Sequence, residues 1–326
     1  MTLNGHSQRY ELYGLPGRNP YAPRVLDPIV RAQDRDLRLS LGGYCQVEPI
    51  YTYLREAIAA ERPAFVVISG RDFTGRTSMA NCVLDLYREL RDVGDRFLVS
   101  RVEVTHHRDF EWFQQMMAQL QNEFEMAELS LSDPLVGAFD RIGNIPESIY
   151  PQKFQAAARM LGSELSRQKS PYAFGALFEG LHTASLINRA QTIFRHTSSL
   201  VVFTHRDYEH AQTPSADLLR ADMFSEEIHL VRLLPLVESQ IQLLAHHRWE
   251  QASKPESPCP FDLDGIAEIF RNAPVPIKAA LTRLAKLLDY KLSLASGETP
   301  WPDNQELAMS RQWLVETVSA MDGWPR

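Results

Sequence analysis

Short apolar runs alternate with stretches of helical periodicity through the first three quarters of the chain. The runs have the character of buried strands and cover residues 64–69, 97–104, 172–179, 199–204 and 228–233. Between them, apolar residues recur at spacings of three and four over 46–60, 76–90, 110–124, 150–167 and a stretch through Leu186. Strands that alternate with helices of roughly 10 to 20 residues predict an α/β fold, a parallel sheet sandwiched by helices. Residues 127–147 contain proline, glycine and acidic residues and are expected to form a surface loop or an insertion.

The pattern changes after Pro235. Apolar periodicity then indicates helices over 241–250, 262–270, 277–292 and 305–321, without a convincing strand between them. We therefore expect an extended N-terminal arm (1–44), an α/β domain (45–236), a small helical lid-type domain (237–295) and a C-terminal helix or tail (296–326). The tail contains Trp301, Trp313 and Trp324, and its apolar stripe either packs against the helical domain or forms a docking surface for another chain.

Composition narrows the class of protein. The chain has 326 residues, 44% of them hydrophobic and 23% charged, which is typical of a globular protein in the cytoplasm. The three cysteines Cys45, Cys82 and Cys259 are far apart, which favours a reducing compartment over a disulfide framework. No apolar run approaches the roughly 20 residues of a membrane span, and the start lacks a signal-peptide pattern. A net charge of -7 argues against nucleic acid as the main partner, although a local basic stripe remains compatible with it.

One motif carries chemistry. Gly70-x-x-x-x-Gly75-Arg76-Thr77 follows the first apolar run and precedes a helical stretch, which is the setting of a phosphate-binding loop with arginine in place of lysine. In that setting, backbone N–H groups and a helix N-terminus hold phosphate oxygens. A planar guanidinium is a poor copy of the lysine point charge. A simple tight turn is the alternative. The candidate nucleotide-contacting residues of the loop are Gly70, Thr74, Gly75, Arg76, Thr77 and Ser78.

The order of these elements around the loop resembles the AAA+ ATPases, and most closely their initiator-like and STAND branches, over roughly residues 46–293. The resemblance implies ATP or ADP with Mg²⁺ as cofactor, or none if the site is degenerate. It implies that the Thr77 hydroxyl binds Mg²⁺ and that Glu179 polarises the attacking water. It further implies that Thr204 senses the γ-phosphate and Lys278 is a second sensor. Either Arg220 or Arg232 would reach the nucleotide of a neighbouring subunit.

The sequence also departs from that family. Phe178 stands where the first of two acidic residues holds the metal, Phe73 replaces an inner loop glycine, and Asp72 adds a negative charge. The missing lysine and carboxylate each remove an electrostatic contribution of about 3 kcal/mol, together about 10⁴-fold in rate. Nucleotide binding tolerates the loss of these groups better than nucleotide hydrolysis does. The plainer interpretations are a helix-capping carboxylate for Glu179, an ordinary strand residue for Thr204 and a solvated cation for Lys278.

Several histidines suggest metal or acid–base chemistry. The pairs His106-His107 and His246-His247 lack acidic or cysteine partners at ligand spacing, which favours a surface or buried polar role over a metal site. The segment His205–His210 follows a strand at the edge where open α/β sheets bind ligands, yet a polar segment of this kind is usually a plain loop.

These observations favour a degenerate AAA+/STAND-like protein that acts as a regulatory or scaffolding subunit of a larger homo- or hetero-oligomeric assembly, with weak or no ATP hydrolysis. An active ATPase switch that uses Arg76 and Glu179 is the alternative. An initiator-like DNA-binding ATPase is a third hypothesis. The acidic balance and the lack of an evident winged-helix segment after residue 293 count against it.

Overall fold

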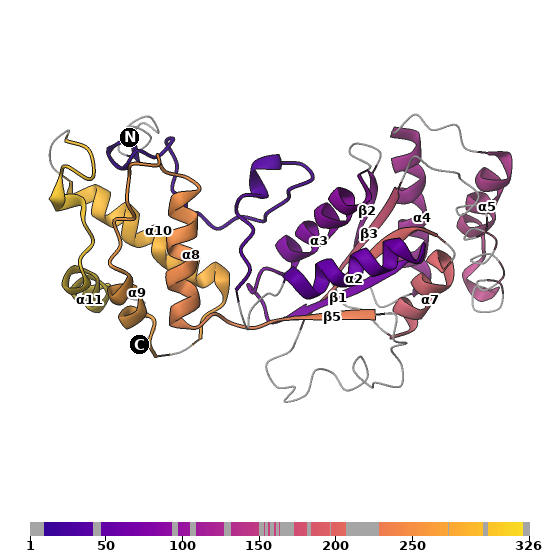
Figure 1. Ribbon diagram of the computed structural model, residues 1–326. Coiled ribbons are helices and arrows are strands. Elements are labelled where there is room, and N and C mark those ends of the chain that lie inside the picture. Colours follow the sequence, from indigo (N-terminus) through magenta and orange to yellow (C-terminus); the bar gives the residue numbers. More distant parts are fainter. Residues whose placement is uncertain are drawn as a thin grey trace, which may run out of the picture.

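Five parallel strands form a single sheet in the computed structural model, in the order β2-β3-β4-β1-β5 (Figure 1). Their bounds are Ala64–Gly70 for β1, Phe97–Val104 for β2, Ala173–Gly180 for β3, Ser199–Arg206 for β4 and Ile228–Leu233 for β5. The structure describes residues 10–41, 47–92, 97–104, 109–126, 132–149, 173–180, 184–195, 197–206, 228–272, 274–295 and 299–321, with Lys153, Ala156, Met160 and Ser163.

Helices cover both faces of this sheet. They are α2 (Val47–Ala59), α3 (Arg76–Arg91), α4 (Asp109–Met126) and α7 (Ala184–Phe194), and α5 (Asp133–Gly143) packs on α4. The connection from β1 runs to the far edge and the next connections return, so right-handed crossovers put α3 on one face and α4 and α7 on the other. Helices α2 and α3 pack against each other and against β1 (Figure 1). The predicted α/β fold with a helix-covered parallel sheet is confirmed.

The inner strands of the sheet are packed between their neighbouring strands and the helices. Every residue of β1 is buried, because β4 and β5 flank it in the sheet and helices pack on it. On β3, the ring of Phe178 packs 5.2 Å from that of Phe203 on β4, and Phe174 packs 5.2 Å from Phe124 on α4. The candidate phosphate-binding loop therefore starts from a fully buried strand inside the sheet.

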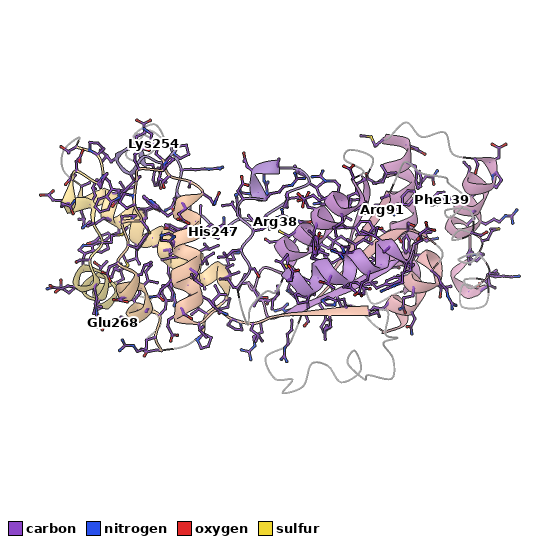
Figure 2. All side chains as sticks on the ribbon, in the orientation of Figure 1. Arg38, Arg91, Phe139, His247, Lys254 and Glu268 are labelled. Atoms are coloured by element: carbon purple, nitrogen blue, oxygen red, sulfur yellow. The ribbon has the colours of Figure 1, made fainter. Side chains whose placement is uncertain are left out.

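Helix α5 contradicts the prediction of a surface loop over 127–147. Pro134 lies in the first turn of the helix, where the missing N–H costs no hydrogen bond, so it starts the helix rather than breaking it. Ala138 and Phe139 are buried, and Phe139 packs against Phe124 of α4. Phe139 lies at the end of the molecule away from the helical lobe (Figure 2). The helix predicted over 150–167 falls almost entirely outside the described residues.

The C-terminal part is a small helical lobe, as the sequence predicted. It contains α8 (Glu238–Glu250), α9 (Leu263–Ile269), α10 (Ile277–Leu294) and α11 (Arg311–Ala320). The single helix predicted over 305–321 is wrong. A short 3-10 turn (η5, Gln305–Leu307) is followed by Met309, which pairs with Phe261, and Ser310 then caps α11 through the N–H of Trp313. Met309 is fully buried, so the tertiary contact overrides helical continuity.

The tail packs on its own chain over the described residues. Leu307 and Leu314 are buried, and α11 packs on α9. The ring of Trp313 stacks on Tyr290 at 6.3 Å. The described part of the apolar stripe thus serves internal packing, whereas Trp324 lies outside the described residues. No helix in the described part of the chain is long and apolar enough to cross a membrane.

The N-terminal segment connects the two lobes (Figure 1). Its first part, with the 3-10 turn η1 (Glu11–Tyr13), packs on the helical lobe, where the hydroxyl of Tyr21 donates to the carbonyl of Ala245 at 3.0 Å. Its second part, with the turn η2 (Ala32–Asp34), packs on the sheet lobe, where Arg35 donates two hydrogen bonds of 2.8 Å to Asp85 of α3. The segment between these contacts passes the phosphate-binding loop.

Candidate nucleotide-binding site

The two glycines of the loop are required by its geometry. Gly75 has φ 88°, the left-handed region that favours glycine, and it is the N-cap of α3. A Cβ on Gly70 would lie 2.5 Å from the Thr74 hydroxyl oxygen and 3.0 Å from the carbonyl oxygen of Leu233. The loop is therefore a close-packed turn that leads from β1 into the first turn of α3, the arrangement that presents backbone N–H groups to an anion.

The loop is braced internally and against the helical lobe. The side chain of Thr74 is fully buried and donates to the carbonyl of Arg71 at 2.8 Å. Phe73, which stands at the inner glycine position, has a positive φ of 66° and is exposed. The backbone N–H of Lys278, at the start of α10, donates to the carbonyl of Phe73 at 3.1 Å, and its Nζ lies 4.7 Å from the centre of the Phe73 ring. Lys278 thus connects the two lobes at the loop.

The side chains of Thr77 and Glu179 meet beside the loop, at the carboxyl-terminal ends of the strands. The hydroxyl of Thr77 donates to a carboxylate oxygen of Glu179 at 2.6 Å. In the strand register Glu179 faces Thr204 of β4. The preceding residue, Phe178, is fully buried against Phe203. A hydroxyl and a carboxylate in contact are the hard oxygen donors that Mg²⁺ prefers.

The loop arginine is paired within the loop itself. An Nη of Arg76 lies 3.2 Å from a carboxylate oxygen of Asp72, and Arg206 at the end of β4 forms an ion pair with the same carboxylate. Asp72 therefore competes with a phosphate group for the Arg76 guanidinium. Such a pair on a partly exposed loop is weak, so a phosphate displaces it at small cost.

A cavity of about 400 Å³ opens from the loop between the two lobes. Five of the predicted site residues line it: Gly75, Arg76, Thr77, Ser78 and Lys278. The other four do not: Gly70 and Thr74 support the loop from below, and Glu179 and Thr204 lie on the adjacent strands. Its remaining walls come from the N-terminal segment, α2, α3, α8 and α10, largely through aliphatic side chains.

The cavity is also lined by three arginines that the sequence analysis missed, Arg24, Arg38 and Arg248. Arg24 forms an ion pair with the buried Asp34, and Arg38 forms one with Glu89 at 3.4 Å. Arg38 lies on the side of the sheet lobe that faces α8 (Figure 2). The third is Arg248 of α8, which is 5% exposed. Its Nε has no hydrogen-bond partner among the described residues, and burial lowers the pKa of its guanidinium to about 10.

A signal for Arg248 is present in the sequence. The buried stripe of α8 is formed by Ile241, Leu244, Ala245, Arg248 and Trp249. An arginine at an apolar-stripe position of an amphipathic helix is unusual, because a charged side chain is almost never fully buried without a partner. Arg248 lies more than 200 residues after Arg24 and Arg38 in the chain, so no local motif could link it to them.

The remaining predicted residues lie apart from the cavity or outside the description. Contrary to the sequence analysis, His246 has an acidic partner four residues on, since its Nδ1 lies 3.2 Å from a carboxylate oxygen of Glu250. Burial lowers the pKa of His247. Arg232 is exposed on β5. His106-His107, Arg220 and the segment 207–210 lie outside the described residues. Within the described part of the chain, no group of three or more His, Cys, Asp or Glu is placed to hold a metal ion.

The residues present fit a nucleotide with Mg²⁺. The cavity volume lies in the usual range of small-ligand pockets, about 300–1,000 Å³. One end offers a helix N-terminus and cations, and the hydroxyl of Thr77 already contacts a carboxylate there. The remaining lining is largely aliphatic and includes Arg24, Arg38 and Arg248. The cavity therefore offers polar groups for phosphates and apolar surface for the rest of a nucleotide.

Comparison with solved structures gives the fold. The ORC2 protein of Aeropyrum pernix, solved as ADPNP–ADP complexes, superposes with a TM-score of 0.52 and 10% identity over 92% of this chain and 71% of that chain. Cdc6p from Pyrobaculum aerophilum gives a TM-score of 0.46, with 13% identity over 80% and 66% of the two chains. The A. pernix ORC1 protein in complex with DNA gives 0.45, with 16% identity over 97% and 72%.

No protein-family model and no curated protein matches the sequence. The expectation that nucleic acid is not the main partner, drawn from the net charge, receives no support from these comparisons. The structural comparison and the loop that leads from β1 into α3 agree with the resemblance found in the sequence. The chain, a helix-covered parallel sheet followed by a small helical lobe, has the fold of the A. pernix ORC2 protein.

Proposed function

We propose that this protein is a nucleotide-dependent regulatory or scaffolding subunit that binds a purine nucleoside di- or triphosphate with Mg²⁺ and hydrolyses it slowly or not at all. The observation that carries the proposal is the 2.6 Å hydrogen bond between Thr77 and Glu179, next to a fully buried Phe178. Gly75, Arg76 and Ser78 would hold the phosphates, and Lys278 would approach them from the helical lobe.

The contact between Thr77 and Glu179 favours a metal-side role for Glu179. In P-loop NTPases the loop Ser or Thr and a strand-end carboxylate hold Mg²⁺ together. Glu179 is the carboxylate that contacts this hydroxyl, and the residue after it is Gly180, which has no side chain to polarise water. With Glu179 serving the metal, strand β3 supplies no second carboxylate for the attacking water. Loss of one such group costs about 3 kcal/mol, or a hundredfold or more in rate.

The position of the cavity supports a regulatory role. Its walls come from the sheet lobe, the helical lobe and the N-terminal segment. A ligand in the cavity contacts all three, so its binding favours one arrangement of the lobes over others, which is what a switch needs. Assembly with copies of this chain or with other subunits would give that rearrangement an output. The exposed Arg232 on the edge strand β5 is the candidate contact to a neighbouring subunit.

The competing function is an active ATPase switch, in which Glu179 activates water. The position of the Glu179 carboxylate beside the loop is also what an active ATPase would need. Steady-state phosphate release from ATP and GTP, measured with the full chain and with Glu179→Gln, separates the two. We expect release at the background rate in both proteins, together with saturable binding of ADP or GDP by calorimetry. Turnover that the Glu179→Gln substitution abolishes would establish the active switch instead.

A further inference from the structure

One part of the cavity wall is a single layer of the N-terminal segment. Residues 23–26, 37–39 and 41 line the cavity, and all of them belong to this segment. Val25 lines the cavity although 49% of it is exposed to solvent, and Pro23 lines it although it is exposed as well. Residues that face the cavity and the solvent at once have no second layer of the described chain outside them. In this part of the wall, one stretch of chain separates the cavity from solvent.

The part of the segment that crosses to the sheet lobe, residues 24–38, is held together by its own contacts. The buried carboxylate of Asp34 accepts hydrogen bonds from the guanidinium groups of Arg24 and Arg31. It also accepts one from the backbone N–H of Asp27. Backbone hydrogen bonds continue the turns to residue 38. The strap, as we call residues 24–38, can therefore move as one body.

The helix that follows the phosphate loop presents a polar stripe to the strap. Positions 78, 81, 85 and 89 of α3 lie at spacings of three and four, so they share one face of the helix. The residues of the stripe are Ser78, Asn81, Asp85 and Glu89. Asn81 is 1% exposed and Asp85 is fully buried. Since buried polar side chains are almost always hydrogen-bonded, this face of α3 needs a specific partner.

The backbone of Leu26 binds the beginning of the stripe. Its N–H donates to the hydroxyl of Ser78 at 3.0 Å, and its carbonyl accepts from the amide of Asn81 at 2.9 Å. Ser78 directly follows Thr77 of the phosphate loop. The strap is thus docked on the first two turns of the helix that the loop begins.

Ion pairs dock the rest of the strap on the same stripe. Arg35 donates two hydrogen bonds of 2.8 Å to Asp85, and Arg38 lies 3.4 Å from a carboxylate oxygen of Glu89. All four residues of the stripe therefore contact the strap. Both arginine side chains are partly exposed, and ion pairs of this kind contribute little each.

The two ends of the N-terminal segment are anchored with different strength. On the helical lobe, Tyr13 and Tyr21 are fully buried, and their hydroxyls donate to the carbonyls of Leu307 and Ala245. A buried aromatic ring with a satisfied hydroxyl is a strong anchor. On the sheet lobe, the strap depends on hydrogen bonds and partly exposed ion pairs. The strap therefore undocks from α3 while the segment stays on the helical lobe.

We infer that the strap is a gate for the nucleotide. It undocks from the stripe of α3 as one body, and the nucleotide enters and leaves the cavity only while it is undocked. The inference rests on the proposed binding of a nucleotide in this cavity and specifies how its exchange is controlled. The strap thereby sets the lifetime of the bound nucleotide, which suits a switch that hydrolyses slowly or not at all.

The test is stopped-flow exchange of ADP and GDP that carry a fluorescent N-methylanthraniloyl group, with the full chain and Mg²⁺. The variants are Asn81→Ala, which removes the donor to Leu26, and Arg35→Met, which removes the pair with Asp85. We expect the association and dissociation rate constants to rise together by about fivefold in each variant, the effect of one ordinary hydrogen bond. The affinity changes less than either rate, because the same opening precedes entry and exit.

A second readout needs no nucleotide. In both variants of the free protein, amide hydrogen exchange over residues 24–38 becomes about fivefold faster, whereas exchange over residues 10–21 is unchanged. Asn144→Ala is the control, since the amide of Asn144 donates to the carbonyl of Asp140 at 2.8 Å, at the end of α5. It removes the same kind of hydrogen bond away from the cavity and leaves both readouts unchanged.

The outcomes separate this inference from the proposed function. Faster hydrogen exchange in the strap with unchanged nucleotide rates overturns the gate and leaves nucleotide binding established. Unchanged hydrogen exchange in the strap overturns its docking on the stripe. Failure of both nucleotides to bind overturns the proposed function and the gate with it. If Asn81→Ala does not fold, Arg35→Met decides by the same two readouts, because Arg35 is partly exposed on the strap itself.

Discussion

Two parts of one cavity wall are built in different ways. The candidate phosphate end is a single run, residues 70–78, between a strand and the helix that follows it. The remaining wall is assembled from the N-terminal segment, α2, α3, α8 and α10, and its arginines are Arg24, Arg38 and Arg248. Arg76 is paired inside the loop, whereas Arg24 and Arg38 are paired with carboxylates elsewhere in the chain. The comparison teaches that a contiguous motif can be recognised in the sequence, whereas a wall assembled by tertiary contacts cannot.

Removing the buried carboxylate of Asp34 disrupts the cavity wall that the N-terminal segment forms. Asp34 is fully buried and accepts hydrogen bonds from Arg24, Arg31 and the backbone N–H of Asp27. Asp34→Asn leaves these guanidinium groups without their carboxylate. We expect a loss of about 2–3 kcal/mol in the free energy of unfolding, because the guanidinium groups are partly exposed and the lowered carboxyl pKa corresponds to a contribution of that size. Urea unfolding at pH 7 measures it. Glu268→Gln, which removes a surface pair with Arg311, is the control and changes the stability little.

The same carboxylate gives a pH signature. Burial alone would raise the pKa of Asp34, but the hydrogen bonds from Arg24, the Asp27 N–H and Arg31 outweigh it and lower the pKa to about 2. A lowered folded-state pKa contributes stability above the unfolded-state value near 4, and that contribution is lost as the pH falls from about 4 to about 2. The difference between Asp34→Asn and the unchanged protein therefore shrinks over this interval. A difference that stays constant down to pH 2.5 would contradict the pairing (about half a unit above the folded pKa).

Gly70→Ala breaks the phosphate end. Its new Cβ would lie 2.5 Å from the Thr74 hydroxyl and 3.0 Å from the carbonyl oxygen of Leu233, so the loop must move. We expect a loss of about 1–3 kcal/mol in stability, and weaker binding of every nucleotide that is tested. Gly137→Ala is the matched control, since nothing lies within 4 Å of a Cβ there and α5 favours alanine. Unchanged nucleotide affinity in Gly70→Ala would show that the loop does not hold the phosphates.

Arg76→Lys sharpens the comparison with a smaller effect. Lysine supplies a compact charge and gives up the contact that Arg76 makes with Asp72 at 3.2 Å. We expect roughly two- to fivefold tighter nucleotide binding, with GDP and ADP affected equally, because a partly exposed pair of this kind is worth little. Asp72→Asn, which releases Arg76, gives a similar gain. Phosphate release that rises above background in Arg76→Lys would contradict the proposal that β3 lacks the group for turnover.

Much of the fold could be predicted from the sequence, because its strands are apolar and its helices amphipathic. The ranges expected for β2 and β5 are those observed. Helix α5 was missed because Pro134 resembles a helix breaker when its position in the first turn is unknown. The break before α11 was missed because the pairing of Met309 with Phe261 is tertiary.

The candidate site could be predicted only where it is local in sequence. Gly70–Ser78 form a contiguous motif, and Glu179 follows from the strand order. Arg248 left a weaker trace, a charge in an apolar stripe, whose meaning depends on a cavity that the sequence does not display. Arg24 and Arg38 left none, since their carboxylate partners are set by how the N-terminal segment packs.

The dependence of nucleotide affinity on Mg²⁺, compared between the unchanged protein and Glu179→Gln, tests the central claim most directly. If Glu179 holds the metal side of the site with Thr77, Mg²⁺ tightens GDP binding in the unchanged protein. The Glu179→Gln variant loses this gain but keeps its affinity for GDP without metal. A variant that keeps the full gain from Mg²⁺ and instead loses measurable phosphate release would contradict the account, because Glu179 would then be acting on water.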